Sequence, residues 1–378
     1  MDALTVTAYC VREDIHLDLE TQARLGRWSF DEIQRQPALS RHWISIVCLA
    51  HNPHDDLLYC GLTAYDNDIV CTFDMDRKVF RSLGFQKVGE RFDAKVHRSL
   101  EVDEAGNVYG ATACLHDIDQ LAESPGGKVF RYDPRQDRFD ILAIPVPRQY
   151  IQTIALDRSR RIIYGFTYPV THLFRLDLDT GQSRDLGYTG LDPHSPAFDD
   201  RGHLWGTWRQ SYGLGHCTPP RASLLHYDPD ADRLTWHRGL SLSALYPGDI
   251  GYPDSVVNGG DGFLYFGTNV GALVRFDPRT LEVRYLGRPL AAQRLPGLIV
   301  GHDGRLFGCG GEHGDTRLFA YDRESGRFSD CGRLADPARG EACRLTHWLS
   351  EPRPGLFYVG ETDNLARTGY LWECQLRQ

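Results

Sequence analysis

The chain of 378 residues is 41% hydrophobic and 25% charged, which is typical of a globular protein rather than of a disordered or fibrous one. Its formal net charge of −9 argues against nucleic acid as a partner, and no apolar run reaches the roughly 18 residues of a membrane-spanning helix. The first residues lack the basic and apolar regions of a signal peptide. This predicts a cytoplasmic protein, or a secreted one if a leader was trimmed.

The first elements of the chain differ from those that follow. Residues 3–11, ALTVTAYCV, alternate between apolar and polar and predict a strand. Residues 12–42 fit no repeat and predict an irregular crossing segment with a little helix. From residue 43 onward a pair of hairpins recurs about every 40 to 50 residues. The first copy combines VCLAHNPHDDLLYCGL with NDIVCTFDMDRKVFRSLG.

This period is typical of the four-stranded blade of a β-propeller. Six complete units are followed by a last one, RLTHWLSEPRPGLFYVGETDNLARTGYLWECQL, which supplies only three strands. The strand at 3–11 can provide the missing fourth and leave no open sheet edge. The sequence therefore predicts an all-β fold. It is a single seven-bladed β-propeller domain over residues 1–378, with its blades in 43–378 and the last blade closed by the N-terminal strand.

Histidines gather at the positions that reach one face of such a propeller. The segment before the innermost strand of a blade and the connection between its second and third strands lie on the same face, which we call the upper face. Seven of the 15 histidines occupy these positions. Three precede innermost strands and four follow second strands: His97, His194 and His347, then His116, His172, His216 and His313. This clustering predicts a functional site at the mouth of the central channel.

Other polar residues are expected on the same face. Tyr168 follows the second strand of the third blade, and the long fourth-blade loop GTWRQSYGLGHCTPPR carries Arg209 and Tyr212. Asn364 lies in the corresponding loop of the last blade. His216 is a candidate metal ligand, although its neighbour Cys217 would point to the opposite side of a strand. The richest loops belong to blades 2, 3 and 4, which predicts a site displaced from the channel axis.

These features resemble the propeller-fold polysaccharide lyases, in particular the ulvan lyases and the fungal rhamnose–glucuronate lyases. The resemblance rests on KVHRSLEVDEAGNVYGAT with the following LH, on YGFTYPVTHLFR, and on GETDNLARTGYLWE. It implies cleavage of a uronic-acid-containing oligosaccharide or polysaccharide by β-elimination. In that reaction a base removes the C5 proton, a polar group neutralises the carboxylate, and an acid protonates the leaving oxygen at C4.

By similarity, His97 and His116 match the paired histidines of the family, and Tyr168 matches its catalytic tyrosine. The resemblance implies that His97 and Tyr168 act as base and acid, while His116 hydrogen-bonds the carboxylate or shares the proton transfer. The family tends to carry an arginine where DPHSPAF has His194. Arg209 is therefore expected to neutralise the carboxylate. Substrate-binding roles are expected for His172, His194, Tyr212, His313, His347 and Asn364.

Two alternatives stay open from the sequence. One is a metal-dependent lyase of short oligouronides, in which several histidines hold Zn, Mn or Ca; the candidate ligands are His97, His116, His194, His216 and His313. The main interpretation requires no cofactor. The other alternative is a non-catalytic propeller that binds sugars or proteins, because the fold alone implies no activity. In each case we expect a monomer or a small homo-oligomer.

Overall fold

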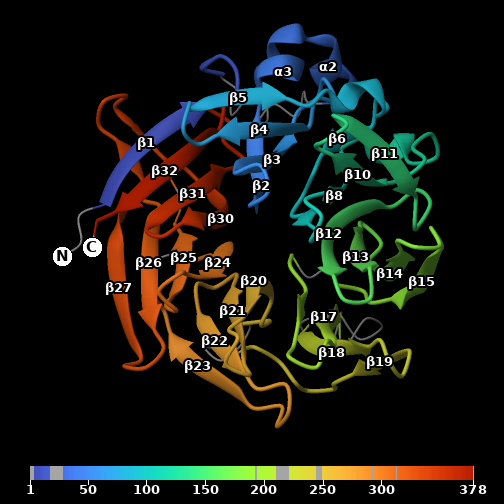
Figure 1. Ribbon diagram of the computed structural model, residues 1–378, viewed down its shortest axis with the longest axis vertical. Helices are drawn as coiled ribbons and strands as arrows, with labels where there is room; N and C mark the ends of the chain where they lie inside the picture. Colours follow the sequence, from blue (N-terminus) through green and yellow to red (C-terminus); the bar gives the residue numbers. More distant parts are fainter. Residues whose placement is uncertain are drawn as a thin grey trace.

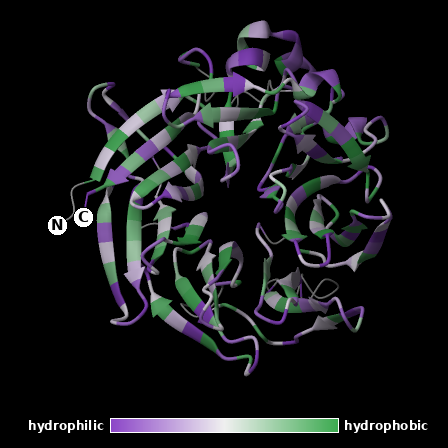
Figure 2. Cartoon of the chain, in the orientation of Figure 1, coloured by the Kyte–Doolittle hydropathy of each residue, from purple (hydrophilic) through white to green (hydrophobic). Residues whose placement is uncertain are grey.

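The chain folds as a seven-bladed β-propeller, which confirms the predicted fold class. The computed structural model describes residues 4–17, 29–191, 194–209, 221–243, 249–291, 293–311 and 313–377. Seven antiparallel sheets are arranged in a ring around a common axis, with the first and last strands side by side (Figure 1). Hydrophobic residues concentrate along the strands, and the connecting turns are mostly polar (Figure 2).

Each blade runs from an innermost strand to an outermost one. The strands of blades 1 to 3 are β2 (Ser45–Asn52), β3 (Leu57–Thr63), β4 (Val70–Asp74) and β5 (Val79–Ser82); β7 (Leu100–Val102), β8 (Val108–Ala111), β10 (Val129–Asp133) and β11 (Arg138–Ala143); and β12 (Tyr150–Asp157), β13 (Ile162–Tyr168), β14 (His172–Asp177) and β15 (Ser183–Tyr188).

Blades 4 to 7 continue the same order. Their strands are β16 (Ala197–Phe198), β17 (Leu204–Arg209), β18 (Ala222–Asp228) and β19 (Arg233–Trp236); β20 (Pro253–Asn258), β21 (Leu264–Thr268), β22 (Leu273–Phe276) and β23 (Val283–Gly287); β24 (Gly297–Val300), β25 (Leu306–Gly310), β26 (Arg317–Asp322) and β27 (Arg327–Arg333); and β30 (Thr346–Arg353), β31 (Leu356–Glu361), β32 (Tyr370–Leu376) and β1 (Leu4–Cys10).

The last blade is closed by the N-terminal strand, as the sequence predicts. β1 pairs antiparallel with β32 from Leu4 opposite Leu376 to Cys10 opposite Tyr370. Trp372 in the middle of β32 is fully buried and packs with apolar residues of blades 6 and 7. The closed ring leaves β32 without an exposed edge for another chain to pair with.

The repeated sequence pattern produces the core between blades. The second strand of every blade contains a glycine: Gly61, Gly110, Gly165, Gly206, Gly267, Gly308 and Gly360. A Cβ atom at Gly165 would lie 2.5 Å from the ring of Phe174, and one at Gly206 would lie 2.8 Å from the ring of Phe166 in the preceding blade. Glycine is needed there because an aromatic ring fills the space of a side chain.

Several short elements lie outside the four-stranded blades, and the two helices among them lie at the top of the view in Figure 1. Two helices, α2 (Phe30–Arg35) and α3 (Pro37–His42), lie in the segment predicted to cross irregularly. Ser29 and Glu32 form a capping box at the start of α2, and Phe30 packs on Phe92. The remaining short elements are the 3-10 turns at Phe85–Lys87 and Ile118–Gln120 and the strands β6 (Asp93–Lys95), β9 (Ala113–Cys114), β28 (Ala335–Asp336) and β29 (Glu341–Ala342). Within the described ranges, the helices are all too short or too polar to cross a membrane.

Candidate functional site

A pocket of about 390 Å³ lies off the axis of the propeller, at the segments that lead into the innermost strands of blades 2 to 5. Three basic and three tyrosine side chains contribute to its wall, together with one amide and one leucine. The lining residues are Lys95, His97, Leu115, Tyr150, Gln152, Tyr168, His194 and Tyr252. None of these described residues is acidic, so the pocket suits an anionic ligand.

His97 and His347 form a buried pair, one on each side of blade 1. Nε2 of His97 lies 3.1 Å from Nε2 of His347. The opposite nitrogens point to backbone carbonyls: Nδ1 of His97 is 2.8 Å from the oxygen of Gln152, and Nδ1 of His347 is 2.7 Å from the oxygen of Val47. The exposed fractions of the two residues are only 5% and 3%. All four ring nitrogens therefore contact protein groups.

His194 brings a third imidazole to the pair. Its ring centre lies 5.7 Å from that of His97 and 5.3 Å from that of Tyr252. Nδ1 of His194 is 2.8 Å from Oδ1 of Asp254. Because an ionised carboxylate only accepts hydrogen bonds, Nδ1 carries the hydrogen and the basic nitrogen of the neutral ring is Nε2. The three histidines at the entries of innermost strands thus approach one another, with His347 as the second residue of β30.

Asp254 is the centre of a buried charge network beside the histidines. Arg294 donates to both of its carboxylate oxygens, at 2.7 and 2.9 Å, and Nη2 of Arg98 lies 3.5 Å away. Burial alone would raise the pKa of Asp254, but hydrogen bonds from His194 and Arg294 and the charge of Arg98 lower it below its usual range. Asp254 is therefore an ionised carboxylate that fixes the orientation of His194.

Lys95 places an amine in the same pocket. It ends β6, which pairs with β3 through Thr63 opposite Lys95. Among the described residues its Nζ has neither a hydrogen bond nor an ion pair. Burial lowers the pKa of Lys95, and Arg98 lowers it further against the opposing effect of Asp363. A lowered pKa makes the neutral amine, which can accept a proton, easier to reach, whereas the protonated form is the one that binds an anion through its charge.

The two buried histidines also have strongly lowered pKa values. For His97 the causes are burial first, then the charges of Lys95, His194 and Arg98. For His347 they are burial and then the charge of Arg98, which donates a hydrogen bond to the backbone oxygen of His347 at 3.2 Å. The protein environment therefore opposes positive charge on this pair.

Tyr168 lies at the open edge of the pocket. It ends β13, stands opposite Tyr150 of β12, and is 39% exposed. The two rings are 4.9 Å apart and tilted by 40°. The phenol is thus reachable by a ligand and held in place by its neighbour, as a proton-transfer group requires.

Several residues predicted for the site lie elsewhere. Nδ1 of His116 is 2.8 Å from the oxygen of Asp117, and its ring packs on Phe92, so only its neighbour Leu115 lines the pocket. His172 pairs with Asp185 of the outermost strand at 2.8 Å. These loop histidines turn toward local partners.

The other predicted residues are distributed over the upper face or lie outside the described ranges. Arg209 ends β17 and does not line the pocket. His313 and Asn364 line a separate pocket of about 330 Å³ in blades 6 and 7, where Asn364 hydrogen-bonds Glu361 at 2.9 Å. Tyr212 and His216 are not among the residues that the structure describes.

The described side chains do not fit a metal centre. Within those ranges no group of three or more His, Cys, Asp or Glu residues has the arrangement of metal ligands. Nδ1 of His194 is engaged by Asp254, and His116 lies apart from the pocket. We therefore derive no chemical step through a metal.

Sequence reasoning missed the charged residues of the site. Lys95 and Arg98 lie beside His97 in KVHRS. Asp254 in GYPDS is the second residue of the innermost strand of blade 5, and Arg294 in AAQRLPG precedes the innermost strand of blade 6. These are the same positions in the repeat that identified the histidines. Aligning the blades and comparing every charged residue at this position, rather than histidines alone, would have found them.

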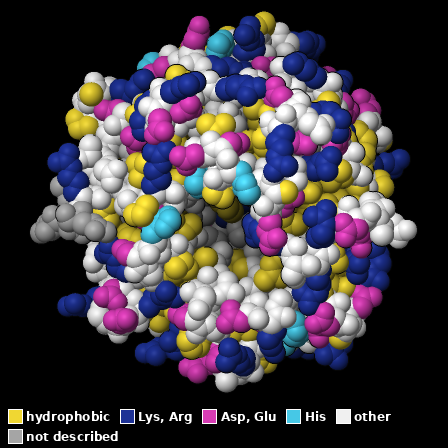
Figure 3. All heavy atoms as spheres, viewed as in Figure 1, with side chains coloured by type: hydrophobic (Ala, Val, Ile, Leu, Met, Phe, Trp, Pro, Cys, Tyr) yellow, Lys and Arg dark blue, Asp and Glu magenta, His cyan; other side chains and the backbone are white. Residues whose placement is uncertain are grey.

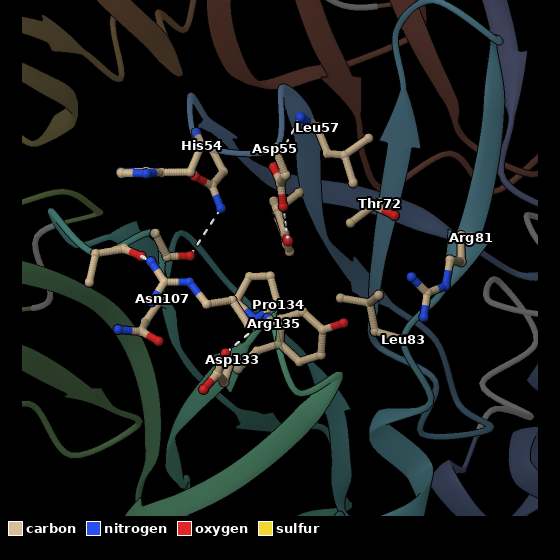
Figure 4. Close-up of a pocket in the computed structure, with 15 residues that line it drawn as sticks. His54, Asp55, Leu57, Thr72, Arg81, Leu83, Asn107, Asp133, Pro134 and Arg135 are labelled. Carbon is tan, nitrogen blue, oxygen red and sulfur yellow. Dashed lines mark hydrogen bonds between the residues drawn. The ribbon is translucent and has the colours of Figure 1, made fainter.

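A different pocket lies between the turns of blades 1 and 2. It measures about 290 Å³, and His54, Asp55, Arg81 and Asn107 are among the residues around it (Figure 4). Two of its charged side chains have close partners: Arg81 binds Asp137 at 2.6 Å, and the hydroxyl of Tyr59 donates to Asp55 at 2.7 Å. The space-filling view shows one face, hollowed at its centre and surrounded by mixed charges (Figure 3).

Comparison with known proteins adds information about the fold. No protein family model matches the chain, and no curated protein matches it. A solved structure of catalytically inactive virginiamycin B lyase from Staphylococcus aureus with quinupristin, in which one histidine is replaced by alanine, is similar with a TM-score of 0.64 and 11% identity. The match covers 99% of both chains.

Two further similar structures are extracellular domains of putative hybrid two-component systems from B. thetaiotaomicron. Their TM-scores are 0.59 and 0.57, with 11% and 14% identity over 87% and 88% of this chain. This chain covers only 38% and 39% of those chains. The three structures show the propeller fold alone, and none of them is an ulvan lyase or a rhamnose–glucuronate lyase.

Proposed function

We propose that this protein is a carbon–oxygen lyase that cleaves a uronic-acid-containing glycan by β-elimination. One observation carries the proposal: a single pocket combines Tyr168, Lys95 and His194 and has no acidic residue among its described lining. Such a pocket can bind a carboxylate and also transfer protons. Both properties are needed to remove the weakly acidic proton next to a carboxylate.

The reaction assigns a task to each side chain. A base takes the C5 proton, the electrons of that bond form the C4–C5 double bond, and the C4–O bond breaks while an acid protonates the leaving oxygen. We assign the proton transfers to Tyr168 and His194, which meet at the pocket. Lys95 neutralises the substrate carboxylate, a role we give to it rather than to Arg209 because Lys95 lines the pocket.

His97 has a different task in this proposal from the one implied by resemblance. Both of its ring nitrogens contact protein groups, Gln152 and His347, so neither points at a substrate. In this proposal His97 does not exchange a proton with the substrate and influences it only through the electrostatic potential in the pocket. His116 has no part in the proton transfer, because it lies outside the pocket.

The comparisons support the reaction class to a limited extent. A lyase shares this fold over nearly its whole length, and its variant with one histidine replaced by alanine is catalytically inactive. The other similar structures are extracellular domains of putative two-component systems, which favours a second candidate, a non-catalytic binding propeller. In that case the Tyr150–Tyr168 pair would stack on a sugar without cleaving it.

The lyase proposal is tested by the product's conjugated double bond, which absorbs in the ultraviolet. The protein is incubated with a panel of glycans that contain glucuronate, iduronate or galacturonate, with and without a chelator. We expect absorbance to rise, and Tyr168→Phe to lower kcat by about 10²- to 10⁴-fold because a proton-transfer group is lost. Tyr188→Phe, at the exposed end of β15, is the matched control and should keep the wild-type rate.

Three outcomes would contradict parts of the proposal. Binding without any rise in absorbance over the whole panel would favour the non-catalytic propeller. Loss of activity with a chelator would favour the metal-dependent lyase. An unchanged rate in Tyr168→Phe would remove Tyr168 from the mechanism.

A further inference from the structure

The hydrogen bonds of the His97–His347 pair fix where its hydrogens lie. A carbonyl oxygen only accepts hydrogen bonds, so Nδ1 of His97 donates to Gln152 and Nδ1 of His347 donates to Val47. In a neutral imidazole the other nitrogen then has a lone pair and no hydrogen. Two neutral rings in this arrangement would direct two lone pairs at each other across 3.1 Å.

That contact is favourable only with a positive charge between the two Nε2 atoms. A separation of 3.1 Å is the length of an N–H···N hydrogen bond, so one extra proton satisfies both atoms. A metal ion has no third ligand among the described His, Cys, Asp and Glu residues. One proton shared between the two Nε2 atoms would therefore complete the pair.

The surroundings make this proton costly when the pocket holds no anion. Facing the pair are Lys95 from β6, Arg98 ahead of β7, and His194 ahead of β16. The nearby carboxylate of Asp254 is already paired with Arg98, Arg294 and His194. The thiol of Cys48 on β2 stays neutral, since burial raises its pKa to about 12. The carboxylate of Asp363 acts on Lys95. Lys95, Arg98 and His194 all lower the pKa values of the pair, so they oppose the added positive charge.

We infer that binding of a carboxylate in this pocket is coupled to uptake of one proton by the His97–His347 pair. A ligand carboxylate beside His97 and Lys95 supplies the missing negative charge. Binding and protonation then favour each other by the same factor, as thermodynamic linkage requires. The identity of the carboxylate as a uronate rests on the proposed function, but the coupling does not require any cleavage.

The shared proton also has a consequence for catalysis. It stays between the two Nε2 atoms and is not transferred to the substrate. The resulting positive charge lies below the pocket and stabilises the negative charge that develops on the carboxylate when the C5 proton leaves. His347 is thus a positioning residue, which acts only through His97.

Isothermal titration calorimetry with glucuronate tests the coupling, because this monosaccharide has no glycosidic bond to cleave. Titrations in buffers of different ionisation enthalpy, over about pH 6 to 9, measure the protons taken up per ligand. We expect about one proton per glucuronate and a Kd that rises by up to about tenfold per pH unit above the pKa of the free pair. The methyl ester of glucuronic acid, which lacks the charge, should bind without proton uptake.

His347→Gln removes the shared proton, since glutamine can donate to Nε2 of His97 without an added charge. The variant should bind glucuronate more weakly and take up no proton. His302→Gln, in an exposed turn of blade 6, is the matched control and should behave as the wild type. If His347→Gln does not fold, His97→Gln serves instead, and ¹⁵N NMR of the wild-type imidazoles reads the protonation of both rings directly.

Several results would overturn the inference. They are binding of glucuronate without proton uptake, proton uptake that persists in His347→Gln, no binding of glucuronate, and bound metal in the purified protein that a chelator removes together with the uptake. Proton uptake in a protein that cleaves no glycan would contradict only the proposed lyase activity. Cleavage without proton uptake would contradict only the coupling.

Discussion

The described part of the chain includes two clusters of three histidines that differ in one respect. In the central cluster, His97 and His347 meet through their Nε2 atoms while backbone carbonyls hold both Nδ1 atoms. In the rim cluster of blade 4, Nδ1 of His226 meets Nε2 of His237 at 2.8 Å, and the ring of His203 stacks on His226 at 5.2 Å.

The difference lies in the protons that each arrangement needs. In the rim pair no carbonyl of the described residues fixes both tautomers, so one neutral ring can donate while the other accepts. In the central pair both rings are fixed as acceptors at the contact, and the pair requires an added charge. A count of clustered histidines therefore does not identify a functional site. The partner of the second nitrogen is what distinguishes the two clusters.

The largest expected effect comes from replacing the carboxylate beside the central cluster, compared with the carboxylate beside the rim cluster. Asp254→Asn leaves the guanidinium of Arg98, whose side chain is fully buried, without its carboxylate. We expect a loss of about 3–5 kcal/mol in the free energy of unfolding, because a buried charge becomes unpaired. Urea denaturation measures it. Asp228→Asn near His203 at the rim is the control, with an expected cost of about 1 kcal/mol or less. Equal losses in the two variants would contradict this distinction.

For the rim cluster we expect a change in pH to alter the free energy of unfolding and not ligand binding. Burial, followed by the charges of His237 and His203, lowers the pKa of His226 to about 4. The folded state thus favours the neutral ring, so its stability is complete above the unfolded value near 6.5 and decreases as the pH falls toward 4.

We expect the wild type to lose about 1–3 kcal/mol more than His226→Gln over that pH interval. Denaturant unfolding at a series of pH values measures the difference, and His302→Gln should follow the wild type. Parallel curves for the wild type and His226→Gln would show that the rim cluster does not titrate in this way.

The smallest expected effect concerns Lys95. Its amine is half-buried, lacks a hydrogen-bond partner among the described residues, and has a lowered pKa, so its charge destabilises the fold at neutral pH. Lys95→Met should raise the free energy of unfolding by up to about 1 kcal/mol while weakening glucuronate binding. Such a result is typical of a binding residue that lowers the stability of the fold. Thermal unfolding and calorimetry check the two quantities. A destabilised variant with unchanged binding would assign Lys95 a structural role.

The fold could be predicted because its signals are local and repeated. The glycine in the second strand of each blade and the alternating pattern of each hairpin indicate the four-stranded blade. The unmatched strand at 3–11 indicates how the ring closes. The approach of His97, His194 and His347 also follows from position, since residues at the entries of innermost strands converge near the axis of the ring.

The remaining parts of the site depend on contacts between distant blades. The tautomers of His97 and His347 depend on carbonyls of Gln152 and Val47, whose direction no side-chain pattern encodes. His116 and His172 were placed less well, because each has a partner close in sequence that the strand pattern does not indicate.

The seam between β1 and β32 has a mechanical consequence. Leu4 begins β1 and lies opposite Leu376, which ends β32. The first residue of one strand and the last residue of the other are therefore at the same end of the strand pair. A force that pulls these two residues apart would load the seven residue pairs one after another instead of all together. The ring would then unzip at low force, and the blade that carries His347 would be the first to lose a strand.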